Sequence, residues 1–346
     1  MKVNLLGSIY RNKVLKKGLE FASDNGALFS AATALTLSTV ARPIAIYSTP
    51  KTDKENRKLA CAKSYASSLV GFGLMLGVTH PLSQNIKKIN NNPENYLNKN
   101  TINTLKNGSK SLLSSKGYQF GTQLFKLGIG AVVAIPKAVI TCALIPPIMA
   151  LTFKTDKNNP SFKTNKNNSQ QTLTFTGNIK KEPIAKGISK VLNNKKVQSF
   201  INKHKDSNYP MHITALTDTL ATSTFILQTQ RNKNIKEERK NVLCANAGIA
   251  TGLSTVSGYI LDKALNKPTE KFIENFKLAN AESPKLDKYV EGIKIAKPAL
   301  ILGSIYYCAI PFISTFFAEK TNKNNKQLKI LSNNNIEKAE HIIINS

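Results

Sequence analysis

The chain has 346 residues, with 49 Lys and Arg against 20 Asp and Glu, which gives a net charge of +29. This excess favours acidic partners, although nucleotide bias in the encoding genome is an equal explanation for part of the Lys and Asn content. Trp is absent and aromatic residues make up only 7% of the chain. Because single-stranded nucleic acid is bound by aromatic side chains interleaved with basic ones, we expect anionic lipid headgroups rather than nucleic acid.

The first half of the chain alternates polar connections with long uncharged runs. Residues 8–22 read as a basic amphipathic helix, which suits a membrane interface or an ordinary protein surface equally well. Uncharged runs follow at 25–41 and 64–86, and a third apolar stretch covers 120–153. Runs near 20 residues are long enough to cross the hydrocarbon layer as a helix. The third stretch contains three prolines, so it is either one kinked span or a re-entrant pair of helices.

The second half follows the same order. A second amphipathic segment at 184–204 precedes a run that starts at Pro210, an uncharged run at 241–261 and an apolar span at 298–318. An Asn-, Lys-, Ser- and Thr-rich stretch without helical periodicity separates the halves and is expected to be flexible. The predicted organisation is a first helical repeat in 1–154, a linker in 155–181, a second helical repeat in 182–320 and a basic tail in 321–346.

An internal repeat is indicated by the basic connection in each half. Residues Glu55–Ala62 resemble residues Glu238–Ala245, with Glu238 lying 183 residues after Glu55 and Cys244 lying 183 residues after Cys61. Compositional bias is the competing explanation for this similarity. The interpretation preferred here is an all-α membrane protein made of two tandem repeats, each with about three long apolar helices, plus amphipathic interfacial helices.

The number of spans per half determines the topology. Three spans in each half would place the corresponding connections on opposite faces of the membrane, as in the inverted repeats of many transporters. If the third stretch re-enters instead, the two halves would run in the same direction. Lysine and arginine are abundant in every connection, so the positive-inside rule does not choose between these topologies.

Few residues qualify as functional candidates. Asp218 interrupts an apolar run, where a carboxylate is costly in hydrocarbon and is often functional, although a helix at a protein–water boundary would also explain it. Arg42, Lys126 and Lys137 are expected to reach the membrane interface. Candidates for interfacial or inter-repeat ion pairs, with a solvated turn as the alternative, are Glu55, Arg57, Glu238 and Arg239.

The sequence contains no motif for catalysis or for cofactor binding. It has no P-loop, no dinucleotide fingerprint and no nucleophile elbow, and its four His lack metal-ligand spacing. We therefore expect no catalytic residues, cofactor or metal, and a location in a membrane of the bacterial inner-membrane type. Three hypotheses remain: a non-enzymatic membrane scaffold, a small transporter with a midplane site near Asp218, and a peripheral basic helical protein that binds anionic lipid or nucleic acid.

Overall fold

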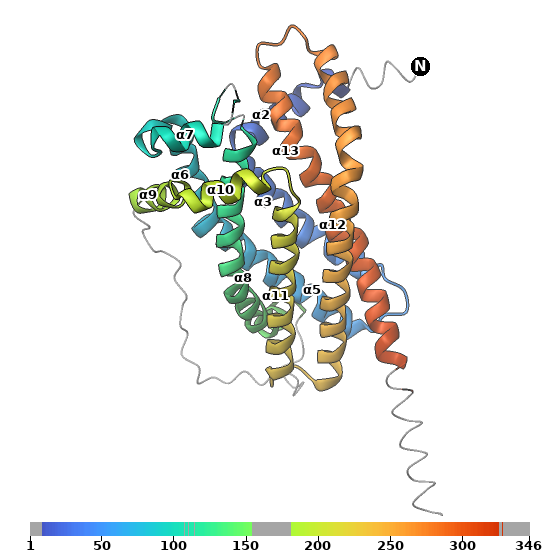
Figure 1. The fold of residues 1–346 in the computed structure, drawn as a ribbon. Coiled ribbons are helices and arrows are strands. Elements are labelled where there is room, and N and C mark those ends of the chain that lie inside the picture. Colours follow the sequence, from blue (N-terminus) through green and yellow to red (C-terminus); the bar gives the residue numbers. More distant parts are fainter. Residues whose placement is uncertain are drawn as a thin grey trace, which may run out of the picture.

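The computed structural model describes residues 9–324, apart from 107, 110, 114 and 154–180, together with residue 327. Every regular element among these residues is a helix, which confirms the all-α prediction (Figure 1). Nearly all of the predicted linker and most of the predicted basic tail lie outside the described residues.

The first half of the chain forms three long helical segments and three short helices. The short helices are α2 (Lys13–Asp24), η3 (Pro93–Asn95) and α7 (Lys99–Lys106). The long segments are α3 (Gly26–Thr36), η1 (Leu37–Ala41) and α4 (Arg42–Tyr47) in succession, α5 (Lys54–Leu74), η2 (Met75–Thr79) and α6 (His80–Asn91) in succession, and α8 (Lys116–Phe153).

The second half has a similar order. Two short helices, α9 (Lys181–Leu192) and α10 (Lys195–His204), precede three long helical segments. These are α11 (Tyr209–Arg231), α12 (Glu237–Ala279), and a continuous segment made of α13 (Leu286–Ser304), η4 (Ile305–Ala309) and residues 310–324.

Three of the long segments contain a single π-helical turn, and each turn precedes a proline. The turns η1, η2 and η4 end two residues before Pro43, Pro81 and Pro311. Proline has no N–H to donate and its ring clashes with the carbonyl group four residues earlier. A π turn widens the backbone at that carbonyl group and lets the helix continue.

The predicted third apolar stretch is a single helix, because α8 continues through all of its prolines. It also lies parallel to α11. Lys116 Nζ, at the start of α8, lies 2.7 Å from Asp206 Oδ1, just before α11 begins. Cys142 Sγ, in the second half of α8, lies 3.8 Å from Thr229 Oγ1, near the end of α11.

The corresponding helices of the two halves therefore run in the same direction (Figure 1). The helices α8, α11 and α13 all run from one end of the bundle, the cap end, to the other, the link end. The connection between α12 and α13 lies at the cap end, and α9 and α10 lie on the same side of the bundle but nearer its middle (Figure 1). The link end carries the connections 48–53 and 232–236. The inverted topology expected from three spans per half is wrong for this structure, since the chain returns to the cap end between α8 and α11.

The starts of corresponding helices keep the offset seen in the sequence. The helix α3 begins at Gly26 and α11 at Tyr209, whereas α5 begins at Lys54 and α12 at Glu237. Both pairs of starts are 183 residues apart, the separation of Asn56 and Arg239.

Apolar side chains form separate cores along the bundle. At the link end α5, α8, α11 and α12 share one core, which includes Leu59, Cys142, Ile145 and Leu243. Towards the cap end α6, α9 and α10 pack around the start of α8. A third core joins α2 to the end of α12 and the start of α13, with Phe276 fully buried at its centre.

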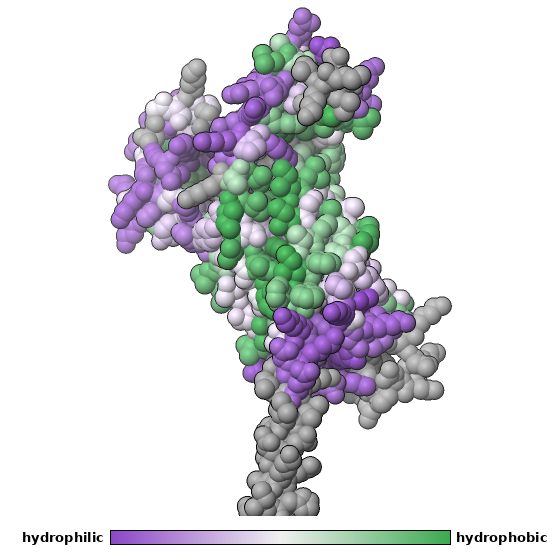
Figure 2. All heavy atoms as spheres, turned by 90° about the vertical axis from the view of Figure 1, so that its right-hand side faces the viewer, coloured by the Kyte–Doolittle hydropathy of each residue, from purple (hydrophilic) through white to green (hydrophobic). Residues whose placement is uncertain are grey.

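Many large apolar side chains remain outside these cores. We call this surface the apolar belt, because Figure 2 shows hydrophobic residues across the middle of one face, between hydrophilic residues at both ends. Each of the six long segments exposes large apolar side chains. They include Val40, Ile44, Leu69, Val132, Ile135, Leu216, Leu220, Val256, Ile260, Phe312 and Phe317.

Four helical segments of the described chain are long and apolar enough to cross a membrane: Leu28–Tyr47, Lys54–Asn91, Lys116–Phe153 and Leu286–Asn324. The first half thus supplies three such segments, as predicted, whereas the second half supplies one. The helices α11 and α12 are long enough, but α11 is rich in Thr and the second half of α12 is charged.

Candidate functional site: a charged cavity between the helices

A cavity of about 520 Å³ lies between the long helices. Side chains from α4, α5, α8, α11, α12 and η4 line it. Four of them are ionisable as Asp, Lys or Arg: Arg42, Lys63, Lys137 and Asp218. We call this space the charged cavity. Its volume lies within the range of sites that bind small molecules.

The charges that line the cavity do not balance. Three are positive and one is negative, and none of the four residues forms an ion pair in the part of the chain that the structure describes. Arg42 lies within electrostatic range of both lysines, and Asp218 lies within range of Lys137. The cavity therefore carries a net positive charge with one acidic group at its wall.

Each lysine is held by contacts with a neighbouring helix. Lys63 Nζ lies 4.4 Å from the centre of the Phe225 ring, so its ammonium group rests on the face of an aromatic residue of α11. Lys137 extends from α8 towards α5, where a Cβ atom built on Gly71 would lie 3.5 Å from its Nζ. The ammonium group of Lys137 therefore lies beside the backbone of α5 at Gly71, where even a methyl group would meet it at an ordinary van der Waals distance.

Two polar groups at the cavity wall have no partner among the described residues. The Nε atom of Arg42 is buried without a hydrogen-bond acceptor, and the Oγ1 atom of Thr141 is buried without any hydrogen bond. Thr141 is only 4% exposed. Buried polar groups are satisfied in the great majority of proteins, so two orphans at one wall call for an explanation.

The rest of the wall is rich in hydroxyl groups. They include Thr222 and Thr251, whose Oγ1 atoms lie 2.6 Å apart between α11 and α12. Tyr306 and Tyr307 reach the cavity from the π turn η4. A smaller cavity of about 230 Å³ shares Arg42, Lys137 and Tyr307 with the charged cavity. The wall can thus donate hydrogen bonds from several directions.

Only part of this cavity could be expected from the sequence. Asp218 was singled out because it interrupts an apolar run, and the structure places it at the cavity wall. Arg42 and Lys137 were expected at a membrane interface, whereas they line the cavity, and only Lys126 is exposed. Lys63 was missed, because it follows the basic connection closely and looks like part of it.

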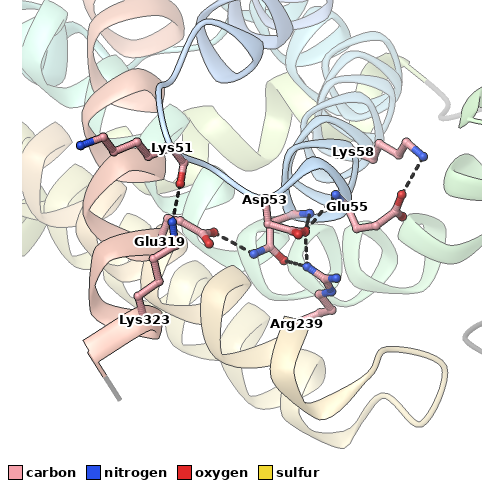
Figure 3. Close-up of polar contacts among 8 residues, drawn as sticks. Lys51, Asp53, Glu55, Lys58, Arg239, Glu319 and Lys323 are labelled. Atoms are coloured by element: carbon pink, nitrogen blue, oxygen red, sulfur yellow. Dashed lines mark hydrogen bonds and ion pairs between the residues drawn. The ribbon is translucent and has the colours of Figure 1, made fainter. Parts of the chain in front are cut away.

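A second polar site, the link cluster, joins the two halves at the link end (Figure 3). It comprises Asp53, Asn56, Arg239 and Glu319. Arg239 pairs with Asp53 and donates to Asn56 Oδ1 over 2.7 Å. Asn56 Nδ2 in turn donates to Glu319 Oε2 over 2.8 Å. These contacts connect the start of α5 to the start of α12 and to the last long helix.

Of the four residues proposed for ion pairs between the halves, Arg239 makes such a pair. Glu55 pairs with Lys58 one turn along the same helix, at 2.7 Å. Arg57 donates to the carbonyl oxygen of Thr49 over 2.6 Å and so ties α5 to the preceding connection. Glu238 lies in the first turn of α12. The partner of Arg239, Asp53, was not singled out because it precedes the similar segment.

The pKa of Asp53 lies below its ordinary value. Burial opposes ionisation of this carboxyl group, but hydrogen bonds from the backbone N–H of Asn56 and from the Arg239 side chain outweigh burial. Asp53 also accepts from the backbone N–H of Glu55 over 3.0 Å and thereby caps α5. The same carboxylate therefore starts α5 and holds α12.

Within the described ranges, no group of three or more His, Cys, Asp and Glu residues could hold a metal ion. Comparison with known proteins gave no match. No protein-family model, curated protein or solved structure is similar enough to the chain to indicate a family. The function must therefore be argued from the apolar belt, the charged cavity and the link cluster.

Proposed function

We propose that this chain is a non-enzymatic integral membrane protein with a structural role, and that its apolar belt contacts the lipid of a bacterial inner-membrane-type bilayer. The belt is the observation that carries the proposal. The two ends beyond the belt are polar and rich in lysine, so they suit the anionic headgroups on either side.

The burial of the four most apolar segments supports this placement. In their most apolar stretches, 17%, 50%, 28% and 28% of the residues are buried inside the protein. In a water-soluble bundle, the apolar face of each helix would turn inward and be covered by its neighbours. Here at least half of each stretch is not buried inside the protein, which is compatible with lipid as the solvent.

The parallel direction of α8 and α11 determines where the chain between them must run if the bundle spans a membrane. Since α8 and α11 both run from the cap end to the link end, the chain between them must return to the cap end. The helices α9 and α10 have 12 and 10 residues, about 18 and 15 Å, and the hydrocarbon layer is about 30 Å thick. Residues 154–180 contain five lysines and one aspartate. The proposal therefore requires these charged residues to connect the two ends of the bundle.

We further propose that the two halves arose by duplication. The shared offset of the helix starts supports this, as does the contact between Asn56 and Arg239, two residues at equivalent positions. Equivalent residues touch each other only near a two-fold axis. With both halves running in the same direction, that axis would lie along the bundle.

Two experiments test the membrane proposal. Alkaline carbonate should leave the full-length protein in the membrane pellet, and its release would refute integral insertion. Single cysteines replacing Lys190, Glu282 and Lys233 should then be labelled by a membrane-impermeant maleimide in a cysteine-free background. Lys190→Cys and Glu282→Cys should react from one side and Lys233→Cys from the other. Labelling of Lys190→Cys from the side of Lys233→Cys would overturn the parallel arrangement of the halves.

A second candidate function is transport of a small solute through a site near Asp218. The charged cavity favours it, because a transporter needs a polar site between helices in an otherwise apolar bundle. Asp218→Asn should change solute flux in proteoliposomes, with Lys126→Gln as the control for a lost surface charge. Unchanged flux in Asp218→Asn would remove the support for this candidate.

A further inference from the structure

We infer that the charged cavity binds a small organic dianion carrying carboxylate or phosphate groups, with Arg42 and Lys63 as its main contacts. The inference goes beyond the membrane proposal and does not depend on it, because it rests on the cavity alone. It adds a ligand class to the second candidate function.

The charges that line the cavity favour a negatively charged ligand. Arg42, Lys63 and Lys137 face one carboxylate, that of Asp218, and no ion pair within the described chain neutralises them. Unpaired charges in a partly dehydrated space are costly, and the cost falls when an opposite charge enters. Asp218 offsets one cation, and since it acts on Lys137, the charges of Arg42 and Lys63 remain. A ligand with two negative charges would complete the balance.

Two buried hydrogen-bond donors that lack partners in the described chain also favour an oxyanion. The Nε atom of Arg42 and the Oγ1 atom of Thr141, both buried without a partner among the described residues, belong to residues that line the charged cavity. A guanidinium group binds carboxylate and phosphate oxygens through parallel N–H donors, which suits Nε and a terminal nitrogen acting together. Thr141 can donate to a further oxygen of the same ligand. An oxyanion could accept hydrogen bonds from donors of this kind, whereas a cation could not.

Three residues that line the cavity lie in or next to π turns. Arg42 directly follows the π turn η1, and Tyr306 and Tyr307 lie within the π turn η4. Single π turns inside long helices often occur at functional sites, because they redirect the side chains next to them. Arg42, next to one such turn, and Tyr306 and Tyr307, within another, come from different halves of the chain and line the same cavity. The hydroxyl groups between them can hold the uncharged part of an organic ligand.

The test is ligand-induced stabilisation of the purified full-length chain in detergent at constant ionic strength. Succinate and glycerol 3-phosphate are the soluble probes, sodium chloride is the reference, and phosphatidylglycerol in mixed micelles represents a lipid headgroup. We expect at least one soluble dianion to raise the melting temperature in a saturable manner. Arg42→Gln and Lys63→Gln should weaken its affinity about 10- to 100-fold, the range for losing a hydrogen-bonded charge.

Two further variants separate the cavity from the general positive charge. Lys126→Gln removes an exposed cation from the same helix as Lys137 and should leave affinity unchanged. Asp218→Asn should bind the dianion at least as tightly as the native protein, because it removes the only negative charge. Equal weakening in Lys126→Gln, weaker binding in Asp218→Asn, or stabilisation by phosphatidylglycerol alone would overturn the inference. So would the absence of any response to the soluble dianions.

Discussion

Replacing Asn56 by alanine should weaken the junction between the two halves. Asn56 is 5% exposed, accepts from Arg239 over 2.7 Å and donates to Glu319 over 2.8 Å. A hydrogen bond to a charged group contributes about 1.5–3 kcal/mol. Arg239 keeps its pair with Asp53 and is partly exposed, so losing its hydrogen bond to Asn56 should cost a free energy at the lower end of that range. Glu319 is 5% exposed and loses a partner, so we expect Asn56→Ala to cost about 2–4 kcal/mol in total.

The matched control is Glu55→Ala, one residue earlier on the same helix. It removes a surface pair with Lys58 that should contribute no more than about 1 kcal/mol. Both variants can be compared with the native protein by thermal unfolding in one detergent at pH 7. If Asn56→Ala unfolds at the same temperature as Glu55→Ala, the link cluster does not hold the halves together, and the argument from its buried hydrogen bonds fails.

Two further predictions concern single contacts. Because the pKa of Asp53 is lowered in the folded protein, its stabilising effect should be full above the ordinary value of 3.8 and should fade as the pH drops through the lowered pKa. Melting temperatures of Asp53→Asn and the native protein should differ at pH 7 and should begin to converge only below about pH 4, as the pH approaches the lowered pKa. A Cβ atom on Gly292 would strike the Leu19 carbonyl group, so Gly292→Ala should destabilise the contact of α2 with α13 by about 1–3 kcal/mol. Gly187→Ala, which meets no atom within 4 Å, should instead stabilise α9 by about 0.5–1 kcal/mol, and a loss of stability there would contradict this reasoning.

The features that could be predicted from the sequence are those that depend on local periodicity. Uncharged runs predicted the long helices, whereas the segments around Glu55 and Glu238, which were expected to be connections, form the first turns of α5 and α12. The direction of the second half could not be predicted, because it depends on where the chain between α8 and α11 returns. The sequence contains no periodic pattern that indicates to which end of the bundle this connection returns.

The charged cavity depends on tertiary contacts. Arg42, Lys63, Lys137 and Asp218 come from four different helices. In the sequence alone Lys63 looks like part of the basic connection, whereas the other three are single charges among mostly uncharged residues. A single lysine in an apolar run can either reach the membrane interface or line an internal cavity. Only the packing of α5, α8 and α11 distinguishes these two positions.

Under the proposed duplication, the two halves are alike at the link end and differ at the charged cavity. Asn56 and Arg239, which lie 183 residues apart, touch each other. At the same offset, Arg42 corresponds to Phe225 and Lys63 to Asn246. The like charges are therefore confined to one half, where they oppose each other at a cost in stability. Such a cost is often retained where a site serves a function.

The substitution Lys63→Asn tests this interpretation, because it gives the first half the residue of the second. It should raise the stability of the ligand-free protein by about 1 kcal/mol, since relief of repulsion from Arg42 and of the buried charge should exceed the lost contact with Phe225. It should also reduce stabilisation by a dianion, so the two melting temperatures should change in opposite directions. A variant that is less stable without ligand yet binds as tightly as the native protein would show that Lys63 supports the fold through Phe225 and has no part in binding.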